Sequence, residues 1–193
     1  QLTLSGHSFS RSELPRLSSR DERTVEIEII TDRVMLAPTE IVDEQKATEL
    51  MQIAGFHLQE EDQVVVVREE KTNVVALMAL PRVLLATIED RYGRRAELTT
   101  PLLRSRLCTE PTAWFYMADD HIYIKVWSEG RLRVAEALPR KKAEDVLYYA
   151  SVLDRQFDLN RFRVVVSGVK AVESEVRATT KLLNKFYKKV VCE

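Results

Sequence analysis

Three segments in the second half of the chain alternate between hydrophobic and polar positions. They are residues 112–117, 121–127 and 131–138. In the middle segment Ile122, Ile124 and Val126 fall on one face, and a period of two of this kind is typical of a half-buried strand. An Asp-Asp turn separates the first two segments, and a short turn containing a glycine separates the last two. The pattern predicts an antiparallel meander of three strands.

The opposite face of the middle segment carries Tyr123, Lys125 and Trp127. Two arrangements remain open for these side chains. Either both faces of the sheet are covered, or this face is uncovered and exposes aromatic residues of the type enriched at protein interfaces.

After Pro139 the hydrophobic period changes. Apolar residues recur at three- and four-residue spacing over 141–157 and again over 173–187, which predicts two helices. Between them, 161–167 holds a continuous run of three valines, typical of a strand covered on both faces. Residues 190–192 form a short closing strand. Strands separated by helices imply parallel pairing through right-handed crossovers, so the unit reads β-β-β-α-β-α-β.

The first half repeats this order more loosely. Its predicted elements are a short hairpin around Gly6, a strand over 24–30 that can extend through Leu36 and ends at Pro38, a helix over 43–54 between an Asp43 cap and a Gly55 stop, strands over 64–67 and 74–80, a helix from Pro81 to Tyr92, and a closing strand over 95–99. The polar segment 10–23 is predicted to be a disordered or shortened loop. We therefore expect a first, degenerate lobe over 1–99, a connector over 100–110 and a second lobe over 111–193.

Composition restricts the classes of function. The chain has 193 residues, a formal net charge of −1, 45% hydrophobic and 31% charged residues, as expected of a soluble globular protein. A balanced charge gives no reason to expect a nucleic-acid partner. No apolar run approaches the roughly 20 residues of a membrane-spanning helix, so we expect no membrane insertion and a cytoplasmic location. Cys108 and Cys192 match no metal-binding or redox spacing.

Two packed copies of the predicted unit, each ribonuclease H-like, resemble the α/β actin-like ATPase fold of sugar kinases, Hsp70 chaperones and actin. Within that fold the sequence is similar to an uncharacterised bacterial family of the domain-of-unknown-function kind. It is also similar to the cytoplasmic actin-like proteins of pilus and secretion machines. The segments that carry the resemblance are residues 38–50, 117–132, 141–149 and 164–168. They extend over nearly the whole chain, and their motifs are structural.

The resemblance implies where a nucleotide would bind. ATP-hydrolysing relatives use one hairpin turn in each lobe, whose backbone amides hold phosphates and whose aspartate holds the metal through water. In the second lobe this turn contains Asp119 and Asp120, but no glycine follows them to allow close approach of a phosphate. The alternative reading is a plain, solvent-exposed turn between two strands.

The other two landmarks of the nucleotide site are incomplete. The first-lobe turn offers Gly6 and Ser8 but no acid. The adenosine-binding turn, where ATPases of this fold tend to carry paired glycines, is reduced to Ser167 and Gly168, and this glycine can instead serve a tight strand-to-helix turn. These six residues are the candidate nucleotide-binding positions, and we interpret the site as degenerate.

The sequence lacks the residues that nuclease, metal-dependent and nucleophilic catalysis require. A ribonuclease H-like nuclease needs carboxylates on its first and fourth strands, but 112–117 and 161–167 contain none. Glu144 and Asp145 fall in a first helical turn, where they favour the helix dipole without a catalytic role. The three histidines have no metal-ligand spacing, and no nucleophile elbow or Walker loop is present. We therefore predict no catalytic residue and no metal site.

Two hypotheses follow. The first is a non-catalytic protein-interaction or scaffold module without a cofactor, whose partner is another protein or a second copy in a homodimer. The alternative is an ATP/Mg-binding protein or slow ATPase, or a kinase-like phosphotransfer enzyme, that uses the cleft between the lobes. Convergent backbone amides in that cleft would favour the alternative, whereas side chains such as His121 or Val169 filling it would favour the first hypothesis.

Overall fold

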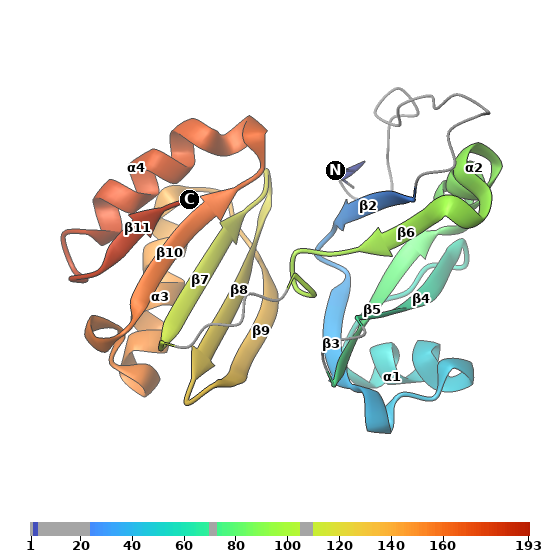
Figure 1. The fold of residues 1–193 in the computed structure, drawn as a ribbon, viewed down its shortest axis with the longest axis horizontal. Coiled ribbons are helices and arrows are strands. Elements are labelled where there is room, and N and C mark those ends of the chain that lie inside the picture. Colours follow the sequence, from blue (N-terminus) through green and yellow to red (C-terminus); the bar gives the residue numbers. More distant parts are fainter. Residues whose placement is uncertain (1, 4–23, 70–72, 105–109) are drawn as a thin grey trace. The chain divides into compact units, whose positions relative to one another are not determined.

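The computed structural model describes residues 2–3, 24–69, 73–104 and 110–193 (Figure 1). The chain divides into two compact units, residues 1–104 and 105–193.

The second unit follows the predicted order of three strands, helix, strand, helix and strand (Figure 1). Its elements are β7 (Thr112–Met117), β8 (His121–Ser128), β9 (Arg131–Pro139), α3 (Ala143–Phe157), β10 (Arg163–Gly168), α4 (Glu173–Leu183) and β11 (Val190–Cys192). Its five-stranded sheet has the order β11-β10-β7-β8-β9. The strands β7, β8 and β9 pair antiparallel, and β10 pairs parallel with both β7 and β11. The meander and the parallel crossovers predicted for this unit are confirmed.

One face of this sheet packs against the two helices. Ile122, Ile124 and Val126 are at most 2% exposed on this face, and Val146 of α3 and Val176 of α4 are buried as well. Gly168, at the end of β10, allows α4 to approach closely, because a Cβ atom there would lie 2.9 Å from a Val176 methyl carbon. The hydrophobic positions of the alternating pattern in β8 therefore lie in the core of the second unit.

The opposite face of the sheet is also buried. Tyr123 is fully buried, and Lys125 and Trp114 are 2% and 9% exposed. The Lys125 ammonium nitrogen lies 4.5 Å from the centroid of the Trp114 ring and 5.1 Å from that of Trp127, so the charge is held between two aromatic faces. Of the two arrangements left open by the sequence, the exposed face is wrong for Tyr123 and Lys125, and Trp127 is half-buried.

The first unit contains two three-stranded sheets. Its elements are β1 (Leu2–Thr3), β2 (Val25–Ile30), β3 (Val34–Pro38), α1 (Ala47–Ile53), β4 (Asp62–Arg68), β5 (Val74–Pro81), α2 (Arg82–Tyr92) and β6 (Ala96–Thr99). One sheet has the order β1-β2-β6 with parallel pairing. The other has the order β3-β5-β4 with antiparallel pairing.

The strand predicted over 24–30 is confirmed as β2, but its extension through Leu36 is wrong, since residues 34–38 form a separate strand, β3, in the other sheet. The chain bends at residues 31–33, where the Arg33 amide donates to the Thr31 hydroxyl oxygen at 3.2 Å. The Arg33 guanidinium also forms an ion pair with the buried Asp62 carboxylate at the start of β4. This polar anchoring, between residues far apart in sequence, redirects the strand.

The valine-rich strand of the first unit is less deeply buried than a simple repeat of the second unit would require. The four valines of 64–67 are only half-buried, because β4 pairs with β5 alone among the described strands. The deeply buried strand is β5, which is central in its sheet. The hairpin predicted around Gly6 and the loop predicted over 10–23 lie outside the described residues, apart from β1.

The capping signals in this unit are confirmed with small shifts. Asp43 accepts a hydrogen bond from the Gln45 amide at 3.0 Å, and the helical segment begins as a 3-10 turn before α1. Gly55 has a φ of 91°, as a helix stop requires. Pro81 is the N-cap of α2 rather than part of its first turn. After β6, Thr100 and Leu102 are buried, so the start of the predicted connector packs into the first unit.

None of the helices in the described part of the chain combines the length and the apolar character needed to span a bilayer.

Candidate functional site

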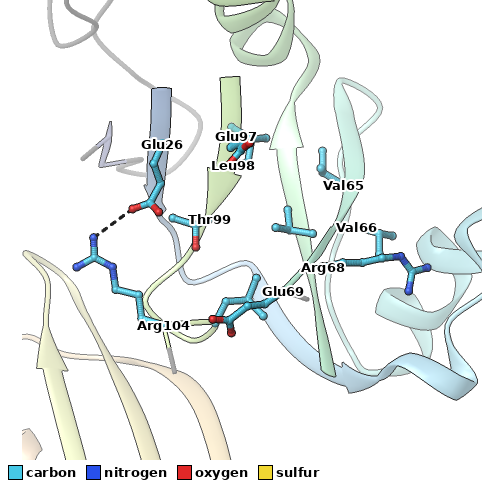
Figure 2. Close-up of a pocket in the computed structure, with 11 residues that line it drawn as sticks. Glu26, Val65, Val66, Arg68, Glu69, Glu97, Leu98, Thr99 and Arg104 are labelled. Carbon is cyan, nitrogen blue, oxygen red and sulfur yellow. Dashed lines mark ion pairs between the residues drawn. The ribbon is translucent and has the colours of Figure 1, made fainter. Parts of the chain in front are cut away.

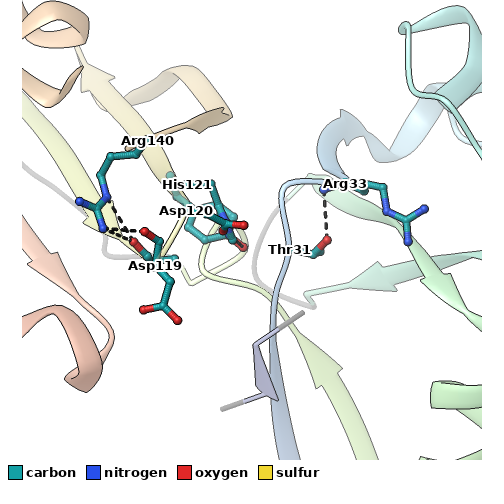
Figure 3. Close-up of polar contacts among 8 residues, drawn as sticks. Thr31, Arg33, Asp119, Asp120, His121 and Arg140 are labelled. Carbon is teal, nitrogen blue, oxygen red and sulfur yellow. Dashed lines mark hydrogen bonds and ion pairs between the residues drawn. The ribbon is translucent and has the colours of Figure 1, made fainter. Parts of the chain in front are cut away.

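The turn between β7 and β8 is held by a buried arginine (Figure 3). Arg140 follows the last residue of β9 and is 1% exposed. Its guanidinium donates to the carbonyl oxygen of Ala118, at 3.2 Å from Nε and 2.6 Å from Nη2, and to that of Asp119 at 3.0 Å. Its Nη1 donates to the Glu175 carboxylate of α4 at 2.6 Å. One side chain therefore connects the turn to the end of β9 and to a helix.

This arrangement fixes the direction of the turn's backbone dipoles. The carbonyls of Ala118 and Asp119 point toward the guanidinium, and the Ala118 amide donates to the His121 carbonyl at 2.9 Å. The Arg140 amide donates to the Asp120 carbonyl at 2.8 Å. Because several backbone groups of the turn already have partners within the unit, its conformation is set by the protein itself.

The Asp120 side chain forms a hydrogen bond with the neighbouring His121 side chain. Its carboxylate lies 2.5 Å from Nδ1 of His121, a ring that is 2% exposed. The other ring nitrogen, Nε2, lies 3.2 Å from the Tyr123 hydroxyl. A carboxylate accepts, so Nδ1 donates to Asp120, and Nε2 lies within hydrogen-bond distance of the Tyr123 hydroxyl. The result is an Asp-His-Tyr chain in which Asp120 orients a buried imidazole.

Asp119 has a different environment. In Figure 3 its carboxylate points away from the guanidinium that binds its own carbonyl oxygen. The side chain is exposed and has no hydrogen bond to another residue in the described part of the chain. A single carboxylate is a weak metal site, and no group of three metal-ligating side chains occurs among the residues that the structure describes.

The structure brings four of the six candidate residues to one end of the sheet. Parallel pairing of β7 and β10 places Ser167 beside Tyr116 and Gly168 beside Met117, next to the Asp119–Asp120 turn. The Ser167 hydroxyl is buried and has no hydrogen-bond partner within the described ranges. Gly6 and Ser8, the first-lobe candidates, lie outside the described residues.

Gly168 has a packing reason that needs no ligand. A Cβ atom at this position would lie 2.6 Å from the Met117 carbonyl oxygen and 3.1 Å from a Val172 methyl carbon. Any larger residue would push β10 away from β7 or from the segment that leads into α4.

Asp145 caps the helix that follows Arg140. Its carboxylate accepts from the amides of Lys141 at 2.7 Å and Lys142 at 3.0 Å. These hydrogen bonds stabilise the charged form and lower the pKa of Asp145 below its usual value. The expected structural role of this acid at the helix start is therefore observed.

The first unit has its own groove, of about 710 Å³ (Figure 2). It is lined by the valines of β4 and by charged residues of both signs, among them Glu26, Glu97 and Arg68. Arg104 forms ion pairs with Glu28 at 2.8 Å and with Glu26 at 3.6 Å. Because both acidic and basic side chains line it, the groove has no single-sign field of the kind that selects a phosphate or a metal.

Sequence reasoning missed Arg140, the residue that organises the turn. A lone arginine after a strand-ending proline is normally exposed, and no local signal distinguishes this one. His121 and Tyr123 were visible only as a turn histidine and a strand aromatic. The contact between the His121 ring and the Tyr123 hydroxyl depends on the pleat of β8, which places residues two apart on one face of the sheet.

Comparison with solved structures gives the fold its name. A protein of unknown function from Bacteroides thetaiotaomicron VPI-5482, described as having an actin-like ATPase fold, matches 88% of this chain and 68% of its own, with 21% identity and a TM-score of 0.73. At this identity the similarity establishes the fold alone, and this chain has the actin-like ATPase fold. The cytoplasmic domain of EpsL, an inner-membrane component of the type II secretion system of Vibrio cholerae, aligns over 75% of this chain and 61% of its own, with 14% identity and a TM-score of 0.42.

No curated protein matches the chain. The sequence profile of one family, described as a protein of unknown function (DUF3822), matches residues 10–190. The match covers nearly the whole chain, in agreement with the kind of family expected from the sequence. The protein therefore belongs to the DUF3822 family.

Proposed function

We propose that this protein is a non-catalytic module that acts through protein contacts, as a scaffold or assembly partner, and that its nucleotide site is degenerate. The observation that carries the proposal is the buried Arg140 guanidinium bound to the carbonyls of Ala118 and Asp119. The turn that would hold a phosphate in an ATPase of this fold is here bound through its carbonyl oxygens by an arginine of the same unit.

The chemistry of the turn supports this proposal. A phosphate-binding turn needs backbone amides that an anion can approach closely, which glycine permits. Here the turn carries two carboxylates and no glycine, and Asp120 is already bonded to His121. Two acids at this position repel a polyphosphate unless a cation lies between them, and Asp119 alone remains to hold one.

Exposed apolar side chains support the contact function. Tyr148, Val152 and Phe186 of the second unit are 63%, 45% and 55% exposed. On the first unit, Ile53 and Val83 are similarly exposed. Contiguous exposed apolar surface is typical of sites that meet another protein, and Tyr148 and Phe186 line one groove. We propose a protein partner or a second copy, with no nucleic-acid partner and no cofactor, in the cytoplasm.

The test is thermal unfolding with and without millimolar Mg-ATP. A ligand that binds only the folded state raises the melting temperature by mass action. We expect the melting temperature to be the same with Mg-ATP as with Mg²⁺ and sodium sulfate at equal ionic strength. A rise of several degrees that requires ATP would overturn the proposal.

One observation favours the alternative, an ATP/Mg-binding protein or slow ATPase. The Ser167 hydroxyl lacks a hydrogen-bond partner and the Asp119 carboxylate is exposed, and both lie at the same end of the sheet in the described structure. On this hypothesis Asp119 holds the hydrated metal and Ser167 contacts the nucleotide. Release of inorganic phosphate from Mg-ATP that is lost in both Asp119→Asn and Ser167→Ala, with unchanged stability, would establish it.

A further inference from the structure

One stripe of α3 is exposed along its whole length. It consists of Glu144, Tyr148, Val152 and Arg155, all exposed to solvent. Because a helix turns by about 100° per residue, these four positions fall within a sector of roughly 80° on its surface. The stripe has an acid at the N-terminal end, two large apolar groups in the middle and a base at the C-terminal end.

The charges at the two ends of the stripe are available for a partner. Neither the Glu144 nor the Arg155 side chain forms an ion pair or hydrogen bond with another residue of the described structure. Arg177 and Glu173 on α4, by contrast, pair with each other within their own helix.

A groove lies alongside this stripe. It has a volume of about 540 Å³ and is lined from α3 by Leu147, Ser151 and Asp154, and from the chain after α4 by Phe186 and Tyr187. Phe186 is 55% exposed, so the groove has an open apolar wall. A ridge of side chains next to a groove is the surface that a second helix packs against.

We infer that α3 is the dimerisation helix of this protein and that its partner is the same helix of a second copy. This inference rests on the proposed function, because it names the partner of the contact module. In an antiparallel pair about a two-fold axis near residue 150, Tyr148 faces the partner's Val152. Glu144 then lies within reach of the partner's Arg155, and each contact occurs twice.

The order of the charged residues along the α3 stripe favours an antiparallel second copy of α3 as the partner. Reversing the stripe exchanges its acidic and basic ends, so an antiparallel copy places unlike charges together at both ends. A parallel copy would place acid against acid and base against base, which is unfavourable. A stripe that is complementary to its own reverse meets the requirement of an isologous interface.

The test is sedimentation equilibrium of the full chain over about 5 to 200 µM, a range that resolves a micromolar dissociation constant. We expect a species of twice the 22.3 kDa chain mass. Glu144→Arg alone, or Arg155→Glu alone, replaces two attractive pairs with two repulsive ones and should raise the dissociation constant roughly tenfold or more. The double variant, E144R with R155E, restores unlike pairs and should return the constant to within about threefold of wild type.

A matched control separates this helix from exposed apolar residues in general. Tyr148→Asp should abolish the dimer, whereas Val83→Asp on α2, which is 56% exposed, should leave it unchanged, with circular dichroism confirming that both variants are folded. A monomer at every concentration, or a dimer that the α3 charge swaps do not affect, would overturn the inference. Either result leaves the proposed function standing, since that function fails only if Mg-ATP binds.

Discussion

The guanidinium of Arg140 donates two hydrogen bonds to the carbonyl oxygen of Ala118, 22 residues earlier in the chain. The donor lies after the third strand of the meander and the acceptor after the first, so the contact closes the end of the sheet. Glu175 compensates the charge from α4 at 2.6 Å. One side chain therefore links the turn after β7 to the end of β9 and to α4.

Removal of this arginine should be strongly destabilising. Arg140→Met leaves the buried Ala118 carbonyl and the partly buried Asp119 carbonyl without their donor, and should lower the free energy of unfolding by about 3 kcal/mol. Urea denaturation measures the change. The matched control is Arg133→Met, whose ion pair with Glu129 is largely exposed and should contribute less than about 1 kcal/mol. Equal effects of the two substitutions would show that Arg140 does not hold the turn.

The close approach at Gly168 gives a second prediction. Gly168→Ala places a methyl group 2.6 Å from a backbone oxygen that cannot rotate away, and should destabilise the protein by about 2 kcal/mol. Ser167→Ala, one residue earlier on the same strand, adds no atom and serves as the control, with an expected change within about 0.5 kcal/mol. A neutral Gly168→Ala variant in chemical denaturation would contradict the packing role assigned to this glycine.

The two tryptophans of the chain are both in the second unit, beside Lys125. Their fluorescence therefore reports on this sheet. Lys125→Ala removes a buried stem and a cation between two rings, and should cost about 2 kcal/mol while shifting the emission maximum. The exposed Lys185→Ala should change neither quantity. An unchanged emission maximum in Lys125→Ala would indicate that the ammonium group does not lie over the rings.

Acid should weaken the cap at the start of α3. Hydrogen bonds from the Lys141 and Lys142 amides lower the pKa of Asp145 in the folded state. The stabilisation is therefore complete above the unfolded pKa of about 4 and is lost as the pH falls through the lower, folded value. We expect Asp145→Asn to melt below wild type at pH 7, with the two curves converging toward pH 2.

An acid in the first turn of another helix provides the control for this pH dependence. Glu49 of α1 is exposed and makes no hydrogen bond to the described residues, so Glu49→Gln should change the melting temperature less than Asp145→Asn at pH 7. A constant difference between Asp145→Asn and wild type from pH 7 to pH 2 would contradict the ionised cap.

The second unit was predictable because its signals are local. The alternation of β8 and the helical spacing over α3 are properties of consecutive residues, and the structure has both elements where the pattern places them. The first unit was less predictable because its bend at residues 31–33 depends on an ion pair between Arg33 and the distant Asp62. No periodicity in a segment of 15 residues reveals such a partner.

The candidate site shows the same limit. The parallel pairing of β7 and β10 was expected, and it places Asp119 and Ser167 at one end of the sheet as their positions in sequence imply. Burial of Arg140 was not expected, since it arises from acceptors on a turn and a helix that lie 21 to 35 residues away. Charged residues are assigned to the surface by default, and only tertiary contacts overrule that assignment.

The central claim, that the nucleotide site is degenerate, is tested most directly by isothermal titration calorimetry with Mg-ATP, performed on wild type and on Asp119→Asn. The account predicts no binding heat for either protein up to millimolar nucleotide. Micromolar binding to wild type that disappears in Asp119→Asn would contradict it and would make the turn after β7 a working metal and phosphate site.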